Sequence, residues 1–161
     1  MNRRNFLLVA ATFAGGFGSN ASAAQTQLRL GGDIDSGTPA YLGEDDLLAL
    51  PQTQFVTSTP WTTSEHQFSG PTLADLLDHF GAGPGDLKLG AINDYTVTVE
   101  RDLVTKEAPI MANRIDGQPF GRREKGPLWI VFPYDHAFIY QREVVFAASV
   151  WQLSQITVLD G

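Results

Sequence analysis

The spacing of apolar residues divides the chain into short helices and short strands. Between Pro71 and Phe80, leucines and the phenylalanine recur three and four positions apart, which predicts an amphipathic helix. Thr72 at its start is a suitable N-cap. Acidic residues at 44–46, followed by leucines and then by Pro51, predict a second, shorter helix. Helices are therefore expected to be few and short.

Strands are expected at more positions than helices. Extended or alternating apolar runs occur at 28–30, 52–59, 66–70, 87–91, 95–99, 128–132 and 150–158. The run 128–132 is continuously apolar, which is typical of a central strand buried on both faces. Residues 109–114 are predicted as a short helical or buried turn, and 115–119 as a turn of the Asp-Gly type. Together these elements predict an α+β domain built on a mixed sheet.

The first 23 residues have the pattern of an export signal. Arg3 and Arg4 precede an apolar run that ends in small residues at Ala23. The Arg-Arg-x-Phe-Leu core indicates the twin-arginine route, which moves folded proteins. The apolar run is too short and too rich in glycine for a membrane-spanning helix, which needs about 20 apolar residues. We therefore expect cleavage near Ala23 and a periplasmic domain at 24–161.

Charge and cysteine content restrict the function further. Without Arg3 and Arg4 the chain keeps nine basic residues against 18 acidic ones, so its net charge changes from −7 to −9. An acidic domain is a poor candidate for binding nucleic acid or anionic membranes. The absence of cysteine excludes disulfides, thiolate nucleophiles and thiolate-held metals. The three histidines are too scattered for a metal-ligand spacing, so we expect no metal.

Five segments carry a family resemblance. They are 68–77, 91–95, 111–119, 126–133 and 151–156, and they are similar to the motifs F-x-G-x-x-L-x-D-L-L, A-x-D-G-Y, L-A-x-x-x-N-G-x-P, G-P-x-R-L-V-x-P and W-x-x-x-x-I. In this order the motifs resemble the sulfite-oxidase-like, molybdopterin-binding oxidoreductase domain. The resemblance covers about residues 45–159. It implies a single α+β domain with a mixed sheet and short helices.

The missing cysteine separates this chain from the catalytic members of that family, which hold molybdenum through a cysteine thiolate. A cysteine-free, exported, single-domain chain is more similar to periplasmic proteins of the same fold that bind a reduced pterin without metal. Those proteins report the pterin to a membrane signalling receptor. The resemblance therefore implies a non-catalytic pterin-binding protein with such a receptor as its partner. A molybdopterin-dependent oxidoreductase or its subunit, and an extracytoplasmic interaction domain without ligand, stay open as alternatives.

A pterin is a flat ring with polar edges, so its site needs aromatic faces and a few aimed polar groups. Asp94 is the first candidate for the amino-imino edge of the ring, because a carboxylate accepts two hydrogen bonds side by side. Asn93 is a weaker partner for the same edge. A turn-forming role is the alternative for Asp94.

Aromatic and basic residues supply the other candidates. Trp61 is expected to line a cleft, with a core or rim position as the alternative, and Tyr95 is intermediate between cleft and core. Trp129 and Trp151 lie in predicted strands and are assigned to the core. Residues 122–125 hold the densest basic cluster of the acidic domain. Within it Arg123 and Lys125 are candidates for a phosphate or a polar tail of the ligand. A solvated rim is the alternative for this cluster.

Overall fold

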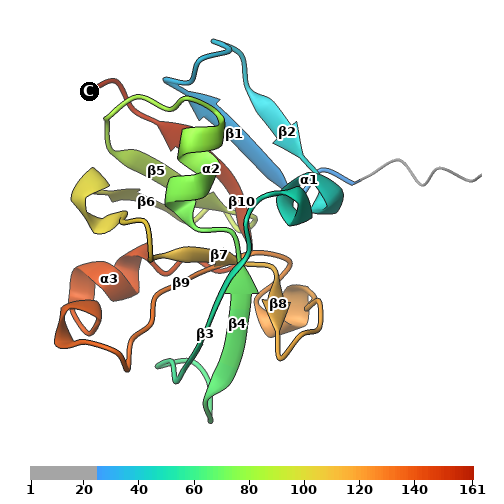
Figure 1. Cartoon of the computed structure of the whole chain (residues 1–161), viewed down its shortest axis with the longest axis vertical. Helices are drawn as coiled ribbons and strands as arrows, with labels where there is room; N and C mark the ends of the chain where they lie inside the picture. The colour runs from blue at the N-terminus through green and yellow to red at the C-terminus, as the bar shows by residue number, and fades with distance from the viewer. Residues whose placement is uncertain (1–24) are drawn as a thin grey trace, which may run out of the picture.

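The computed structural model describes residues 25–161, and Figure 1 shows their arrangement. The predicted export signal at 1–23 lies outside the described residues. Within 25–161, no helix has both the length and the apolar composition that a membrane crossing requires. Residues 25–161 fold as an α+β domain, as predicted, with ten strands and three short α-helices.

A five-stranded mixed sheet forms the upper half of the molecule in Figure 1. Its strands are β1 (Leu28–Gly32), β2 (Ala40–Leu42), β5 (Leu87–Ala91), β6 (Thr96–Val99) and β10 (Leu153–Val158), in the order β2-β1-β10-β5-β6. Strand β10 runs parallel to β1 and antiparallel to β5. The last strand of the chain is therefore the central strand of the sheet. All of these strands except β2 were predicted.

Two smaller sheets complete the fold. One contains β3 (Thr53–Thr57), β4 (His66–Gly70) and β8 (Arg114–Ile115), and the other pairs β7 (Ile110–Ala112) with β9 (Trp129–Val131). In Figure 1 the β3–β4 hairpin extends away from the five-stranded sheet, and β7 and β9 lie between the two. The loop that joins β3 to β4 contacts the part of the chain that follows β9, because the Ser58 hydroxyl donates to Asp135 at 2.8 Å.

Two sequence predictions need correction. Residues 109–114 do not form a helical turn, because Ile110 and Ala112 pair with β9 and the segment extends as strand β7. The run 128–132 is fully buried, as predicted, but β7 is the only strand that pairs with β9 in a sheet, and the other edge of β9 makes an isolated bridge between Trp129 and Trp151. A continuous apolar run indicates burial on all sides. Here the segment before β10 borders the second edge of β9, where the Ile130 amide donates to Val150 O at 2.8 Å, and no regular strand does.

The helices are short and depend on packing. They are α1 (Glu44–Ala49), α2 (Leu73–His79) and α3 (Glu143–Ala148), with 3₁₀ turns at Arg101–Leu103, Arg122–Glu124 and Phe138–Tyr140. Leu73, Leu76 and Leu77 of α2 are fully buried, which confirms the predicted apolar face. The predicted cap is also present, because Thr72 Oγ1 accepts a hydrogen bond from the Asp75 amide at 3.0 Å. Helix α3 was not predicted.

We expect Thr72→Ala to lower the free energy of unfolding by about 1 kcal/mol, because the first turn of α2 would lose its only side-chain cap. Chemical denaturation followed by circular dichroism measures this. Thr72→Ser is the matched control, since it keeps the hydroxyl and should recover most of the loss. Equal destabilisation by both variants would show that the buried methyl group, and not the cap, matters at this position.

Candidate functional site

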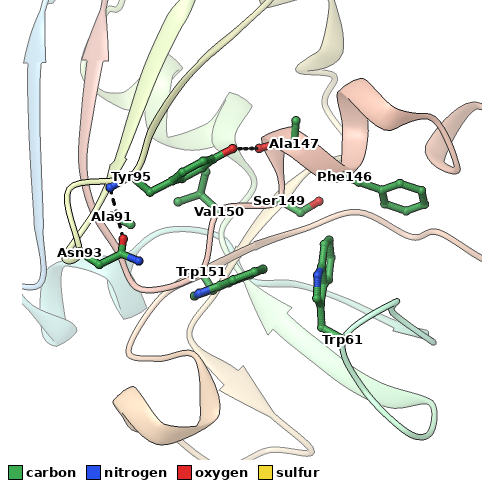
Figure 2. A pocket seen from close by; sticks show the side chains of 9 residues that line it. All are labelled: Trp61, Ala91, Asn93, Tyr95, Phe146, Ala147, Ser149, Val150 and Trp151. Atoms are coloured by element: carbon green, nitrogen blue, oxygen red, sulfur yellow. Dashed lines mark hydrogen bonds between the residues drawn. The ribbon is translucent and has the colours of Figure 1, made fainter.

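A hollow of about 240 Å³ opens where the β5–β6 turn, the end of α3 and the β3–β4 loop meet (Figure 2). Its lining residues are Trp61, Ala91, Asn93, Tyr95, Phe146, Ala147, Ser149, Val150 and Trp151. We call it the aromatic hollow, because four of the nine side chains are aromatic. A mostly apolar lining with a few polar groups suits a small flat ligand.

Trp61 forms one wall of the aromatic hollow. It lies at the corner of the β3–β4 loop, where Thr62 N donates to Thr59 O at 3.3 Å across Pro60. Proline favours this position in a β-turn because its φ is already set. The Trp61 ring is half-buried and meets Trp151 edge-on, with ring centroids 5.5 Å apart. It meets Phe146 edge-on as well, at 6.1 Å.

The opposite wall comes from the β5–β6 turn. Asn93 Oδ1 accepts a hydrogen bond from the Tyr95 amide at 3.3 Å, and the Tyr95 hydroxyl donates to Ala147 O at 3.3 Å. Within 25–161 the Asn93 side-chain nitrogen donates to no residue, and Figure 2 shows it on the side of the aromatic hollow. Asn93 therefore offers a hydrogen-bond donor to a ligand, and Tyr95 offers an aromatic face.

Asp94 lies on the other side of the same turn. It adopts φ of 65°, and its amide donates to Ala91 O at 3.2 Å. Left-handed backbone is tolerated by Asp at turns. The Asp94 side chain lines a second hollow of about 370 Å³, together with Gly90, Ala91, Ile92, Thr96, Ser154 and Gln155. The structure thus brings Trp61, Asn93 and Tyr95 together and leaves Asp94 outside the aromatic hollow.

Ser149, which lines the aromatic hollow, forms a buried hydrogen-bonded pair with Tyr134. Tyr134 donates to Ser149 Oγ at 2.6 Å, and Ser149 in turn donates to Val145 O at 2.7 Å. Burial raises the pKa of Tyr134 to about 12, against the opposing effect of its hydrogen bond to Ser149. Tyr134 is therefore neutral at ordinary pH. Because Ser149 already donates its proton to the protein, it is a poor donor for a ligand.

Neither of the predicted basic candidates lines the aromatic hollow. The Lys125 ammonium lies over two indole rings, 5.6 Å from the centroid of Trp151 and 5.8 Å from that of Trp129. A cation in this position is attracted by the ring faces. Arg123 is exposed in the 3₁₀ turn Arg122–Glu124 and lines neither hollow. Lys125 thus supports the wall formed by Trp151, and a phosphate contact by either residue stays a prediction.

Two aromatic residues of the site were missed by sequence reasoning. Trp151 was assigned to the core, but it precedes β10, is only half-buried and lines the aromatic hollow, whereas Trp129 is buried as predicted. Phe146 was not singled out because it lies on the unpredicted helix α3. The available signal for Trp151 was its place at the start of the motif W-x-x-x-x-I, before the alternating part of the strand.

Elsewhere Ser64, His66 and Asp116 are arranged in the order of a hydrolase triad. Ser64 Oγ lies 3.3 Å from His66 Nε2, and His66 Nδ1 lies 2.7 Å from Asp116 Oδ2. Hydrogen bonds from His66 and from the Gln67 amide hold the pKa of Asp116 below its usual value. None of the three residues lines either hollow, and a triad acts on a bound substrate beside oxyanion donors. We assign these three residues a structural role, in which their hydrogen bonds connect β4 to the turn after β8.

The architecture is consistent with the sulfite-oxidase-like fold that the sequence motifs imply. The sulfane dehydrogenase SoxCD from Paracoccus pantotrophus is a solved structure that shares it, with a TM-score of 0.64 and 14% sequence identity. The match covers 86% of this chain and 39% of that chain, so the present chain spans less than half of its neighbour's length. At this identity the likeness shows the fold alone. No family model and no curated protein matches the sequence.

Proposed function

We propose that this chain is a periplasmic, non-catalytic pterin-binding protein. A reduced pterin occupies the aromatic hollow without a metal, and the loaded protein signals its presence to a membrane receptor. The observation that carries the proposal is the aromatic hollow itself, with Trp61, Tyr95 and Trp151 around one small volume. Its position in a sulfite-oxidase-like fold, and the export pattern of residues 1–23, support the same proposal.

The size and chemistry of the hollow favour a small bicyclic ring. Its volume of about 240 Å³ lies below the roughly 300–1,000 Å³ that is usual for drug-sized ligands. Aromatic side chains bind such a ring by stacking or by edge-on contacts. The free side-chain nitrogen of Asn93 supplies a donor for an oxygen or ring nitrogen at the pterin edge. Asp94 would meet the ligand only where it extends beyond the β5–β6 turn.

A molybdenum-containing cofactor does not fit the residues of this chain. The sequence contains no cysteine, and residues 25–161 hold no group of three or more His, Asp or Glu side chains able to hold a metal ion. The pterin part alone can use the aromatic hollow, whereas the thiolate that normally anchors the metal has no counterpart. For this reason we derive no redox step and keep the oxidoreductase as the second candidate only.

Binding can be tested on protein purified after export. Mass spectrometry should find a pterin that copurifies, and titration of stripped protein with a reduced pterin should quench tryptophan fluorescence with saturation. Guanine is the matched control, because it is flat and shares the amino-carbonyl edge but has a smaller second ring. Equal binding of guanine would reject pterin specificity. Molybdenum near one equivalent would reject the metal-free proposal.

A further inference from the structure

The loop that carries Trp61 is held at its start by a carboxylate from a distant part of the chain. Asp135, which follows β9, accepts hydrogen bonds from the Ser58 amide and, at 2.8 Å, from the Ser58 hydroxyl. The Asp135 amide donates to Thr57 Oγ1 at 3.2 Å. Thr57 is fully buried at the end of β3, so this anchor is fixed to the core. One side chain thus sets the direction in which the β3–β4 loop leaves its strand.

The two residues that flank Asp135 in sequence also contact β3 and the β3–β4 loop. His136 Nε2 lies 3.2 Å from Val56 O, and Tyr134 meets the Trp61 ring edge-on at 6.3 Å. The ring of Tyr134 in turn packs against that of Phe146, with ring centroids 5.7 Å apart. The segment from Tyr134 to His136 therefore contacts both the end of β3, where the loop starts, and the Trp61 ring that the loop presents.

Hydroxyl groups continue the support from Ser58 to the tryptophan. The Trp61 amide donates to Thr59 Oγ1 at 3.1 Å, and Thr59 and Thr62 join their hydroxyls at 3.0 Å. Thr62 also donates to Ser64 O at 3.0 Å. With these bonds made, the loop has little freedom except at its two ends. Ser58, which Asp135 holds, directly precedes this hydrogen-bonded group.

Asp135 has no contact with the candidate ligand site. It is exposed and lines neither hollow. The hydrogen bonds from the Ser58 amide and hydroxyl hold the pKa of Asp135 below its usual value, with a smaller contribution from His136. Asp135 is therefore ionised at neutral pH and keeps both oxygens as acceptors. Its contacts all lead to the loop and not to a ligand.

We propose that Asp135 is a positioning residue that presets Trp61 as a wall of the aromatic hollow before a ligand arrives. The ligand itself rests on the proposed function above, but the placement of Trp61 does not. If Trp61 is already in position, binding does not have to supply the entropy cost of ordering it. The affinity for the ligand therefore depends on the hydrogen bonds of Asp135. Asn at position 135 retains the shape of the side chain but has one oxygen where Asp135 uses two.

The placement of Trp61 can be tested without ligand. In Asp135→Asn we expect faster amide exchange at residues 58, 59, 61 and 62. We also expect stronger acrylamide quenching of the Trp61 fluorescence, which is isolated by subtracting the signal of Trp61→Phe in the same background. Asp46→Asn is the matched control, because Asp46 is also exposed and accepts a hydrogen bond from a backbone amide, that of Gly43 at 2.8 Å. It should leave both readings unchanged. Unchanged exchange and quenching in Asp135→Asn would overturn the proposal.

A double-mutant cycle with a reduced pterin then tests whether Asp135 acts through Trp61. We expect Asp135→Asn to weaken binding roughly tenfold in the parent protein and by less than about twofold in a Trp61→Ala background. Equal losses in both backgrounds would overturn the proposal. If the parent protein binds no pterin, the proposed function fails while the exchange and quenching experiment still decides the role of Asp135.

Discussion

Trp61→Ala is expected to weaken binding of a reduced pterin by roughly 10- to 100-fold while leaving the fold intact. Trp61 is half-buried in a loop outside every strand and helix, and its ring forms a wall of the aromatic hollow. Removing the ring opens the hollow to water and removes its contact with the ligand. Fluorescence titration measures the affinity, and circular dichroism checks the fold.

Trp61→Phe and Tyr41→Ala are the controls for this prediction. Phenylalanine keeps an aromatic wall and should recover part of the affinity. Tyr41 on the edge strand β2 is 62% exposed and lines neither hollow, so its replacement should not change binding. A Trp61→Ala protein that binds pterin as well as the parent would place the ligand elsewhere, and the second hollow beside Asp94 would be the next candidate.

Trp129→Ala should lower the free energy of unfolding by about 3–5 kcal/mol, the usual cost of truncating a buried large aromatic residue. Trp129 is 1% exposed and meets Phe68 edge-on at 5.5 Å and Trp61 at 6.1 Å. Its removal would leave a cavity between the β7–β9 pair and the β3–β4 hairpin. Urea denaturation, with the slope checked for two-state behaviour, measures the loss.

Trp129→Phe separates packing from hydrogen bonding at this position. The indole Nε1 of Trp129 is buried and has no hydrogen-bond partner within 25–161. Phenylalanine removes this unpaired donor, whose burial opposes folding, and fills most of the space. We expect it to cost well under half of the Trp129→Ala loss. Equal losses in the two variants would contradict this account and would indicate that the indole N–H is paired, for example with a water molecule.

The fold could be predicted to the extent that local patterns determine it. Helix α2 has a cap, an apolar face and a glycine-rich end, so its existence and its start at Thr72 were predicted correctly. Helix α3 lacks such signals, because Val144, Val145 and Phe146 have poor helix propensity and its N-cap Arg142 makes no side-chain cap. Strand β7 was missed because its three residues become a strand only through pairing with β9.

In the candidate site, too, the residues that depend on local sequence were predicted and those that depend on tertiary packing were not. Asn93 and Tyr95 lie in one tight turn, so a single motif predicted both, and Trp61 followed from the loop expected at Pro60. The left-handed backbone at Asp94 determines the side of the turn on which each side chain lies. Asp94 therefore lines the second hollow, whereas Asn93 and Tyr95 line the aromatic hollow. Phe146 and Trp151 come from segments more than 50 residues further along the chain. Tertiary packing alone brings them to the hollow.

The central place of β10 bears on how the protein is made. Strands β1 and β5 have no contact in the sheet except through residues 153–158. During synthesis the edges of β1 and β5 that face β10 therefore stay unpaired until nearly all of the described chain has left the ribosome. Pairing of β10 with β1 also closes a long loop, which slows completion of this sheet. Until then the open edges of β1 and β5 are able to pair with other chains, which a sheet that grows in sequence order avoids.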